Sequence, residues 1–328
     1  MPSRRPAIAD RQNSPQILTL VRAMSTAHAR ALRLERLRRW IAFVVALTSL
    51  LAATWPVLTA PVAAAGAVWA LLQGAGLSPW VQRSTAHAAV VQELFDVSLF
   101  EIEWNTVAVG NPPSAAEISA LARAYRGPED LIVDYYEIGD LPDLSRPLDV
   151  LACQMQNLGW GSRVHRRFAD GVLAAVIGWA LLGVLVGVLL SMSLSRLLLV
   201  WYLPALGALQ LGLELHRRQR DTATVRSRAL TLVRERVEAN LRDPRRPGQT
   251  EALLMLARRV QDLLFTTRRA QVRVPDWFFL RFRPTDRVDF RREMTELSRL
   301  VTGADGAPEA PRTATPPPGE PPRASPSA

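Results

Sequence analysis

Three groups of residues in this chain combine polar side chains with aromatic rings or arginine. They are Arg11-Gln12-Asn13, then Phe95-Asp96 with Trp104-Asn105, and finally Cys153-Gln154 with Asn157 and Trp160. On a helix, Cys153, Asn157 and Trp160 fall at positions i, i+4 and i+7, which share one face. Amides can form hydrogen bonds with base edges, and tryptophan can stack on a base, so these groups are candidate nucleotide contacts. The alternative is that they make packing and capping contacts within the protein.

Enzymatic chemistry finds little support in the sequence. The chain contains no P-loop, no G-x-S-x-G elbow, no H-E-x-x-H motif and no paired metal-ligand motif. Cys153 is the only cysteine, which excludes an intrachain disulfide and a thiolate zinc cluster. The four histidines are scattered along the chain. We therefore predict a protein that is not an enzyme and that uses no cofactor and no metal.

The elements that must position these groups include four apolar stretches. Residues 41–82 contain no charged residue, and Pro56 and Pro61 lie near their middle. A hydrocarbon core of about 30 Å requires roughly 20 apolar helical residues, so this stretch is long enough for two spans joined by a turn. Residues 171–195 and 197–213 are also uncharged and predict the third and fourth spans. The predicted fold is a mainly α-helical membrane protein with two transmembrane hairpins.

Arginine gathers at one end of every span. The flanking residues are Arg30, Arg33, Arg36, Arg38 and Arg39 before span one, Arg83 after span two, Arg163, Arg166 and Arg167 before span three, and Arg217, Arg218 and Arg220 after span four. Short loops rich in arginine stay in the cytoplasm. We therefore predict a multi-pass membrane protein, with both termini and the segment between spans two and three in the cytoplasm.

Charge and apolar runs together divide the chain into six segments. The predicted segments are a basic N-terminal segment (1–39), a transmembrane hairpin (40–82), an acidic insert (83–170), a second hairpin (171–215), a basic helical region (216–302) and a disordered Pro-rich tail (303–328). Residues 1–39 have a net charge of +7, residues 83–170 of −6 and residues 214–301 of +9. The three charged segments could dock on one another or form independent solvated surfaces. All 40 basic residues are arginine, whose planar group suits phosphate and carboxylate.

Helix signals continue outside the spans. Ser114 and Glu117 form a capping box for a helix that is expected to end at Gly127-Pro128. Residues 131–138 are rich in β-branched and aromatic types and predict a short strand or an extended turn. The aromatic cluster Trp277–Leu280 suits either a membrane interface or a soluble core. Further helices are expected at 81–100 in continuation of span two, at 149–168 leading into span three, and at 214–241, 250–271 and 285–301.

The spans themselves contain small residues at four-residue spacing and no ionisable residue inside spans one to three. The small residues are Gly66, Ala70, Gly74 and Ser78 in span two and Gly183 and Gly187 in span three. Such spacing lets helices approach closely, which serves either homo-oligomerisation or packing within one chain. The absence of buried charge argues against a transporter or a proton pump.

In these motifs the chain resembles the SMODS-associating four-transmembrane effectors (S-4TM) of bacterial anti-phage nucleotide signalling. The matching pieces, in order from residue 8 to residue 300, are Ile8-x-x-Arg11-Gln12-Asn13, Gln92-Glu93-Leu94-Phe95-Asp96, Trp104-Asn105, the helix from Pro113 through Glu117-Ile118 to Leu121-Ala122, Asp134-Tyr135-Tyr136, Cys153-Gln154-x-x-Asn157-x-x-Trp160, and Val274-Pro275-Asp276-Trp277. The chain departs from the family pattern at Met155, Gly161 and Phe168, so its ligand or its binding mode could differ.

The resemblance implies a partner nucleotidyltransferase that makes a cyclic oligonucleotide when phage infect. The effector would bind this messenger in the cytoplasm, not DNA, and would then disrupt the inner membrane by oligomerisation or pore formation, as in abortive infection. The ligand contacts implied are Arg11, Gln12, Asn13, Asp96, Trp104, Asn105, Tyr136, Gln154, Asn157 and Trp160, with Arg163 and Arg166 as local cations in the acidic insert. Two alternatives remain from the residues alone: a membrane scaffold that recruits a cytoplasmic partner, and a membrane enzyme acting on lipid.

Overall fold

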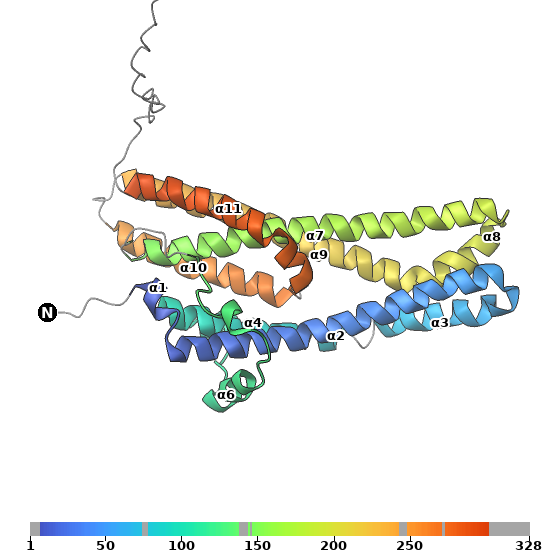
Figure 1. The fold of residues 1–328 in the computed structure, drawn as a ribbon, viewed down its shortest axis with the longest axis horizontal. Coiled ribbons are helices and arrows are strands. Elements are labelled where there is room, and N and C mark those ends of the chain that lie inside the picture. The colour runs from blue at the N-terminus through green and yellow to red at the C-terminus, as the bar shows by residue number, and fades with distance from the viewer. Residues whose placement is uncertain are drawn as a thin grey trace, which may run out of the picture.

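The computed structural model describes residues 7–73, 78–137, 144, 146–242, 248–270 and 273–301, and every regular element in this part of the chain is a helix. The molecule is elongated, and Figure 1 shows that the helices form two regions along its long axis. One region, the apolar half, contains the hairpin tips. Long helices of the hairpins extend from it into the other region, the polar half, where the shorter helices surround them. The elements in each half explain how the candidate residues are placed.

Helix α2 (Pro15–Thr54) runs the length of the molecule and leads into the first hairpin tip. It starts with proline at its first position, where a missing N–H costs nothing. Its 40 residues span about 60 Å at 1.5 Å per residue. A 3₁₀ turn (Pro56–Leu58) then connects it to α3 (Thr59–Leu72), as the prolines predicted. The basic N-terminal segment and span one therefore share a single helix.

The second hairpin is built from two long helices that pack against each other. Helix α7 (Leu148–Leu189) ends in a turn, and α8 (Leu194–Leu197) and a π-helical turn (Leu198–Tyr202) lead into α9 (Leu203–Arg242). The predicted helix before span three and the span itself are one unbroken rod, as expected. The helix predicted at 214–241 is likewise the continuation of span four.

Three helices in the described residues are long and apolar enough to cross a membrane, Pro15–Thr54, Leu148–Leu189 and Leu194–Arg242. The predicted second span is a shorter apolar helical segment, Pro56–Leu72. Helix α4 (Ser78–Phe100) follows it, as the expected helix at 81–100. Whether α3 and α4 form one helix, as predicted, depends on residues 74–77, which lie outside the described residues.

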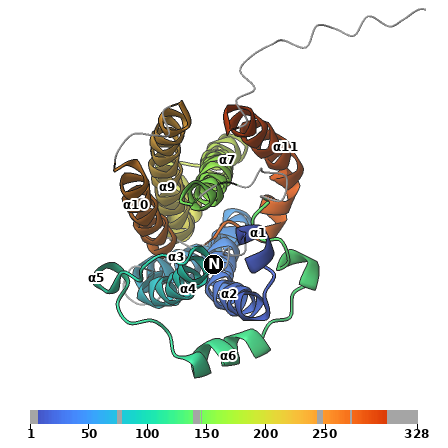
Figure 2. The same cartoon turned by 90° about the vertical axis from the view of Figure 1, so that its left-hand side faces the viewer.

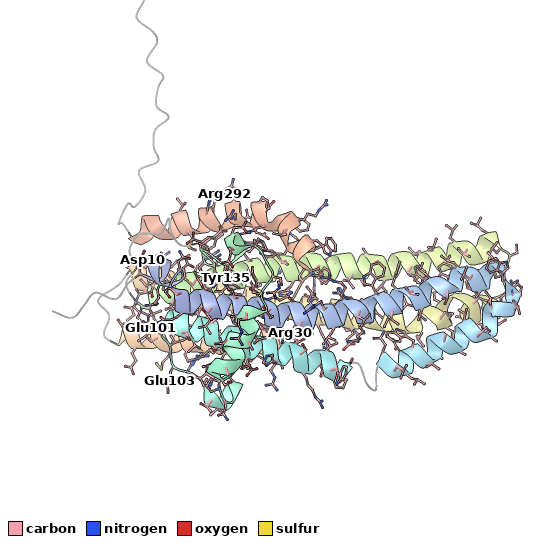
Figure 3. The ribbon with its side chains drawn as sticks, turned by 60° about the horizontal axis from the view of Figure 1, so that its bottom comes forward. Asp10, Arg30, Glu101, Glu103, Tyr135 and Arg292 are labelled. Carbon is pink, nitrogen blue, oxygen red and sulfur yellow. The ribbon has the colours of Figure 1, made fainter. Side chains whose placement is uncertain are left out.

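The polar half contains the shorter helices. They are α1 (Ile8–Arg11), α4, α5 (Thr106–Val109), α6 (Ala115–Arg123), a 3₁₀ turn (Glu129–Leu131), α10 (Gln249–Ala270) and α11 (Asp276–Val301). Viewed along the axis, α6 lies outside α2 and α4, while α10 and α11 lie on opposite sides of the pair formed by α7 and α9 (Figure 2). Charged residues such as Glu101, Glu103 and Arg292 lie in this half (Figure 3).

Three details of the predicted elements are corrected. The Ser114 hydroxyl accepts a hydrogen bond from the Glu117 N–H at 3.2 Å, as the capping box requires, but α6 ends at Arg123, before Gly127. Between residues 131 and 137 the chain forms turns and not the strand that was one of two possibilities. Helix α11 begins at Asp276 instead of residue 285 and contains Pro284, because the proline that precedes the helix, Pro275, is the true boundary.

The hydrophobic core lies mainly in the polar half. Its largest fully buried side chains include Phe95, Phe100, Leu151 and Leu158, contributed by α4 and α7. In the apolar half the opposite holds, since only 11% of the most apolar window of α7 is buried. Leu181, Val188 and Leu189, for example, are 63–72% exposed. A continuous exposed apolar surface of this kind suits contact with lipid.

The small residues of the spans contact other parts of the same chain. A Cβ atom on Gly66 would lie 2.3 Å from the Pro204 Cα, and one on Gly183 would lie 2.4 Å from the Trp201 ring. Gly187 faces Leu197, and Ala70 contacts Gly207. Gly74 lies outside the described residues. The packing alternative thus holds within one chain, and a role of these residues in contacts between copies stays a prediction.

Candidate functional site

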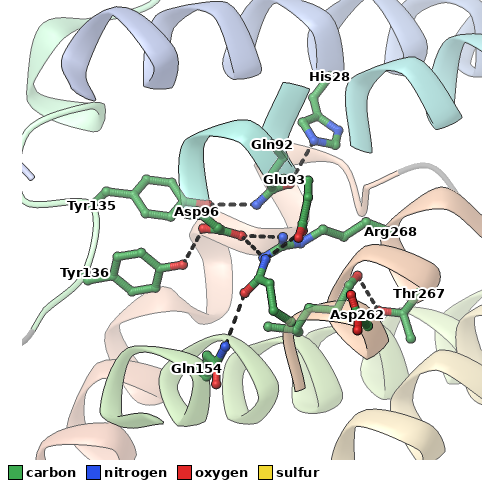
Figure 4. Close-up of polar contacts among 12 residues, drawn as sticks. His28, Gln92, Glu93, Asp96, Tyr135, Tyr136, Gln154, Asp262, Thr267 and Arg268 are labelled. Atoms are coloured by element: carbon green, nitrogen blue, oxygen red, sulfur yellow. Dashed lines mark hydrogen bonds and ion pairs between the residues drawn. The ribbon is translucent and has the colours of Figure 1, made fainter. Parts of the chain in front are cut away.

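Asp96 is the centre of a fully buried polar network in the polar half. One of its carboxylate oxygens accepts a hydrogen bond from the Tyr136 hydroxyl at 2.8 Å. The other accepts from Arg268 at 2.5 Å and from Gln261 at 3.0 Å, both on α10 (Figure 4). Burial lowers the pKa of Arg268, but the neighbouring Asp96 carboxylate outweighs this effect, so the pKa is raised. Burial and the same carboxylate raise the pKa of the Tyr136 phenol.

Glu93 extends this network one helical turn along α4. Because Glu93 and Asp96 are three residues apart, they share the helix face that meets α10. Glu93 accepts hydrogen bonds from Arg258 and Gln261, each at 2.7 Å. Burial raises the pKa of Glu93 despite these partners. Gln154 of α7 completes the arrangement, donating to the Ala257 carbonyl at 2.9 Å and to the Gln261 side chain at 3.3 Å. The network therefore joins α4, α7 and α10.

The N-terminal group clamps the loop that carries Tyr136. The Gln12 amide donates to the Tyr136 carbonyl at 3.2 Å and accepts from the Tyr136 N–H at 2.9 Å. Asn13 donates to the Asp134 carboxylate at 2.8 Å and accepts from the Asp134 N–H at 3.0 Å. Arg11 donates to the Leu99 carbonyl at 2.9 Å. Gln12 and Asn13 therefore form hydrogen bonds with backbone groups of an irregular loop that has no helix or strand partners.

Three other predicted contacts, Trp104, Asn105 and Trp160, serve capping and packing. Asn105 accepts from the Ala108 N–H as the cap of α5 and donates to the Asp262 carboxylate at 3.1 Å. Trp104 donates to the Gly110 carbonyl at 2.8 Å. Trp160 packs edge-on against Phe290 of α11, with ring centroids 6.2 Å apart.

The structure thus brings Gln12, Asp96 and Tyr136 into direct hydrogen bonds and connects Gln154 to them through Gln261. The sequence analysis predicted a helix at 250–271 but did not single out the partners Arg258, Gln261 and Arg268. A signal was present, since residues 261 and 268 are seven apart and so share one face of the helix. No group of three or more side chains suited to a metal ion occurs in the described part of the chain.

A second site, the α7–α9 groove, is open. It has a volume of about 480 Å³ and is lined by Ser162, Arg163, Arg166, Ser227, Leu230, Thr231, Arg234, Glu235 and Glu238. Arg166 is exposed, and its guanidinium has no hydrogen bond or ion pair with any residue that the structure describes. Arg163 donates to the buried Asp286 of α11 at 3.0 Å, and Arg167 shares that carboxylate at 3.0 Å. The groove therefore contains both cations that the sequence nominated.

Two buried pairs hold α7, α9 and α10 together close to the groove. His165 of α7 pairs with Gln219 of α9 at 2.5 Å, and burial together with the nearby Arg226 lowers the pKa of His165 to about 3. Arg226 itself donates to Thr267 of α10 at 3.1 Å, and burial lowers its pKa to about 9. The imidazole is consequently neutral in the folded protein near pH 7.

A model of one protein family, the SMODS-associating 4TM effector domain, matches residues 6–297. This chain belongs to that family. The resemblance drawn from its motifs is confirmed, and the chain is a membrane effector of the SMODS-associated class. The family name indicates four transmembrane segments, which fits the three long candidate spans together with the shorter apolar segment at 56–72.

A curated relative from Bacillus cereus (strain VD146) is named a probable CBASS effector molecule. It is 29% identical over 124 residues, which cover 38% of this chain and 41% of the relative. The match therefore spans about two fifths of the relative's length. No solved structure gives a significant match to this S-4TM chain.

Proposed function

We propose that this protein binds a cyclic oligonucleotide, made in the cytoplasm by a partner nucleotidyltransferase during phage infection, and then destroys the barrier of the inner membrane. Membership of the effector family supports the setting, and the name of the Bacillus relative agrees with it. The proposed ligand site is the α7–α9 groove. Its volume of about 480 Å³ is in the range of small-molecule sites.

One structural observation supports this assignment most strongly. The two helices that form the walls of the groove continue without interruption into spans three and four. Arg166 is only five residues from Gly171, where the uncharged stretch of α7 begins. Because a helix is stiff over this distance, a change in the separation of α7 and α9 at the groove would move both spans.

The chemistry of the groove suits a phosphodiester. Arg163 and Arg166 can donate charge-assisted hydrogen bonds to phosphate oxygens, and the hydroxyls of Ser162, Ser227 and Thr231 can add neutral ones. Glu235 and Glu238 lie in the same groove and repel anions. We expect them to face the ribose or base edges of the ligand, while the phosphates lie towards α7.

Arg163 connects the groove to α11. In the structure this arginine is held by Asp286, whose side chain is 1% exposed. A bound phosphate would compete with Asp286 for Arg163, which would leave Arg167 as the carboxylate's remaining described partner. Ligand binding would thereby loosen the contact between α7 and α11. A ligand shifts such an equilibrium only through this kind of difference in affinity between two states.

The proposed orientation places the groove where the messenger is made. Both hairpin tips lie at the end of the molecule opposite the polar half, as Figure 1 shows. The arginines that flank the spans lie toward the polar half, so the positive-inside rule puts this half, with the N-terminus and α11, in the cytoplasm. Because the spans contain no charged residue in their interior, we expect general loss of the barrier and not a selective channel.

Membrane disruption would require several copies of the chain. The small-residue faces at Gly66 and Gly183 are occupied within the chain in this structure. Assembly would therefore use the exposed faces of the spans, or it would follow a separation of α7 from α9 that frees the small residues. In either case the homo-oligomer forms after ligand binding.

The test uses the full chain in liposomes that contain a fluorescent dye, to which a panel of synthetic cyclic di- and trinucleotides is added. We expect dye release with at least one of them and recovery of that nucleotide unchanged, since the protein is proposed not to be an enzyme. Arg166→Ala should abolish release. The matched control is Arg228→Ala on α9. Arg228 is exposed, like Arg166, but it does not line the groove.

Other outcomes of this experiment would reject the proposal. If Arg166→Ala and Arg228→Ala released dye equally, the groove would not be the ligand site. If no nucleotide caused release but the intact protein held a stable protein partner, the scaffold alternative would replace the effector mechanism. Turnover of the lipid during the assay would revive the enzyme alternative.

A further inference from the structure

The first turns of α11 present exposed apolar side chains outside the four spans. Trp277 is 67% exposed and Leu280 is 46% exposed. The neighbouring Phe278 is half-buried and packs on Phe168 of α7, with ring centroids 5.2 Å apart, as well as on the Trp277 ring at 5.6 Å. Arg281 follows on the exposed side of the helix. Trp277, Leu280 and Arg281 thus form an exposed group, and this group has a defined position relative to the spans.

That position is the boundary between the apolar and polar halves. Phe168 and Val274 form a cluster with Val172 of α7 and Leu215 of α9. On α7, the uncharged stretch begins at Gly171, and on α9 the corresponding stretch ends at residue 213. The start of α11 therefore lies at the level where both spans leave the predicted hydrocarbon region.

The direction of the helix changes at the same place. The first turns of α11 run across the long axis of the molecule, while the rest of the helix runs along it and away from the apolar half (Figure 1). Pro284 lies inside the helix, and a proline removes one backbone hydrogen bond and bends a helix. If the long axis follows the membrane normal, residues 277–283 lie parallel to the membrane plane.

We propose that residues 277–283 of α11 form an interfacial docking surface for the lipid bilayer. Trp277 and Leu280 would enter the boundary between headgroups and acyl chains, and Arg281 would contact the phosphates of anionic headgroups. Tryptophan favours this boundary because its ring is apolar while its N–H remains polar. A short amphipathic segment with aromatic residues and arginine is typical of helices that lie in the interface.

A lipid surface is the partner that the surroundings favour. The same turns of α11 reach the ends of the spans, because Phe278 packs in one cluster with Val172 and Leu215. The rest of α11 is held to the protein instead, by the Asp286 carboxylate bound to Arg163 and Arg167, and by the buried Phe290. The inference does not depend on any nucleotide ligand, so it can hold even if the proposed function fails.

Thiol labelling offers a direct test, because Cys153 is the only cysteine and is fully buried. Trp277→Cys and Leu280→Cys are each labelled with an environment-sensitive fluorophore in the full-length protein. The proteins are then reconstituted in vesicles of phosphatidylcholine and phosphatidylglycerol that contain spin-labelled lipids. Val107→Cys on α5 and Val288→Cys beyond Pro284 are matched controls, since both valines are exposed on the polar half. The unsubstituted chain measures background labelling.

We expect probes at 277 and 280 to show blue-shifted emission and strong quenching by the spin-labelled lipids, and the probes at 107 and 288 to behave as in water. Arg281→Gln should weaken the quenching at position 277 in vesicles that contain phosphatidylglycerol. Emission at 277 and 280 equal to that at 107 would overturn the proposal. A blue shift without quenching would also overturn it, because protein and not lipid would then cover the surface.

Discussion

The Asp96 network and the α7–α9 groove both contain carboxylates and guanidinium groups but differ in how the guanidinium groups are paired. In the network, carboxylates, guanidinium groups and amides bind one another across α4, α7 and α10, with Asp96 and Gln154 fully buried. In the groove, Arg166 faces solvent without a described partner. The first site is closed by its own contacts, and the second is open to an incoming anion.

This difference shows that residue type alone does not identify a ligand site. A nucleotide could reach Asp96 only by displacing Arg268 or Gln261, which would leave buried charges unpaired. In the groove the same nucleotide would displace water from Arg166 and compete only for Arg163. We therefore expect substitutions in the network to act on folding and substitutions in the groove to act on signalling. Four predictions test this division, in order of their expected effect on the free energy of unfolding.

Asp96→Ala should have the largest effect. Removing the carboxylate leaves the buried Arg268 without its charged partner, which costs about 3–5 kcal/mol in comparable buried pairs. We expect a strongly lowered thermal unfolding midpoint in detergent, or a loss of folded protein. Asp130→Ala, at an exposed aspartate, is the control and should leave the midpoint unchanged. A stable Asp96→Ala protein that fails only in ligand binding would reverse the assignment of the two sites.

Gln12→Ala should have the next largest effect. It leaves the N–H and the carbonyl of Tyr136 without partners in a buried loop, at a cost of about 1–3 kcal/mol. Asn13→Ala breaks the equivalent pair with Asp134, but that pair is exposed and water can replace it. The thermal unfolding midpoint of Gln12→Ala should therefore lie well below that of Asn13→Ala. Equal decreases of the midpoint would show that burial of the Gln12 pair does not increase its contribution to stability.

Much of this fold could be predicted from the sequence. Uncharged stretches and their prolines located the hairpins, because a bilayer demands long apolar helices, and the Ser114 capping box located the start of α6. The start of α11 was wrong, since the aromatic residues 277–280 were read apart from the helix that Pro275 begins. Local signals of this kind act within a few residues, so they are visible in a single sequence.

The candidate site was less accessible to such reasoning. Asp96 and Arg268 are 172 residues apart in the sequence, and no local pattern indicates that they pair. The polar groups were recognised as unusual, and in the structure Gln12, Asp96 and Asn105 bond within the chain, while a role of these groups in ligand binding stays a prediction. Arg163 and Arg166 were nominated for their charge alone, whereas the groove that contains them depends on how α7 packs against α9.

The pH dependence of stability should show a smaller effect near the groove. The pKa of His165 is about 3 in the folded protein and close to 6.5 when unfolded, so the unfolded state takes up the proton first as the pH falls. Stability is therefore fully present above about pH 6.5 and declines toward about pH 3, by at most about 1.4 kcal/mol per pH unit from this group. His165→Gln should reduce the difference between unfolding midpoints measured at neutral and mildly acidic pH. His28 remains in both proteins, so an unchanged difference would show that His165 is accessible to protons in the fold.

Arg166→Ala should have the smallest effect on stability, less than about 0.5 kcal/mol, because the side chain is exposed and forms no described contact. The same substitution should abolish nucleotide-dependent dye release. Arg166→Ala would then remove the response to the nucleotide while leaving the stability of the protein almost unchanged. Arg163→Ala sharpens the contrast, since it removes a phosphate ligand and also one of the two arginines that hold Asp286. We expect Arg163→Ala to lower the unfolding midpoint modestly and to abolish release. If Arg163→Ala instead released dye without any nucleotide, the Asp286 contact would be the restraint that holds the effector inactive, and the groove would act by breaking it.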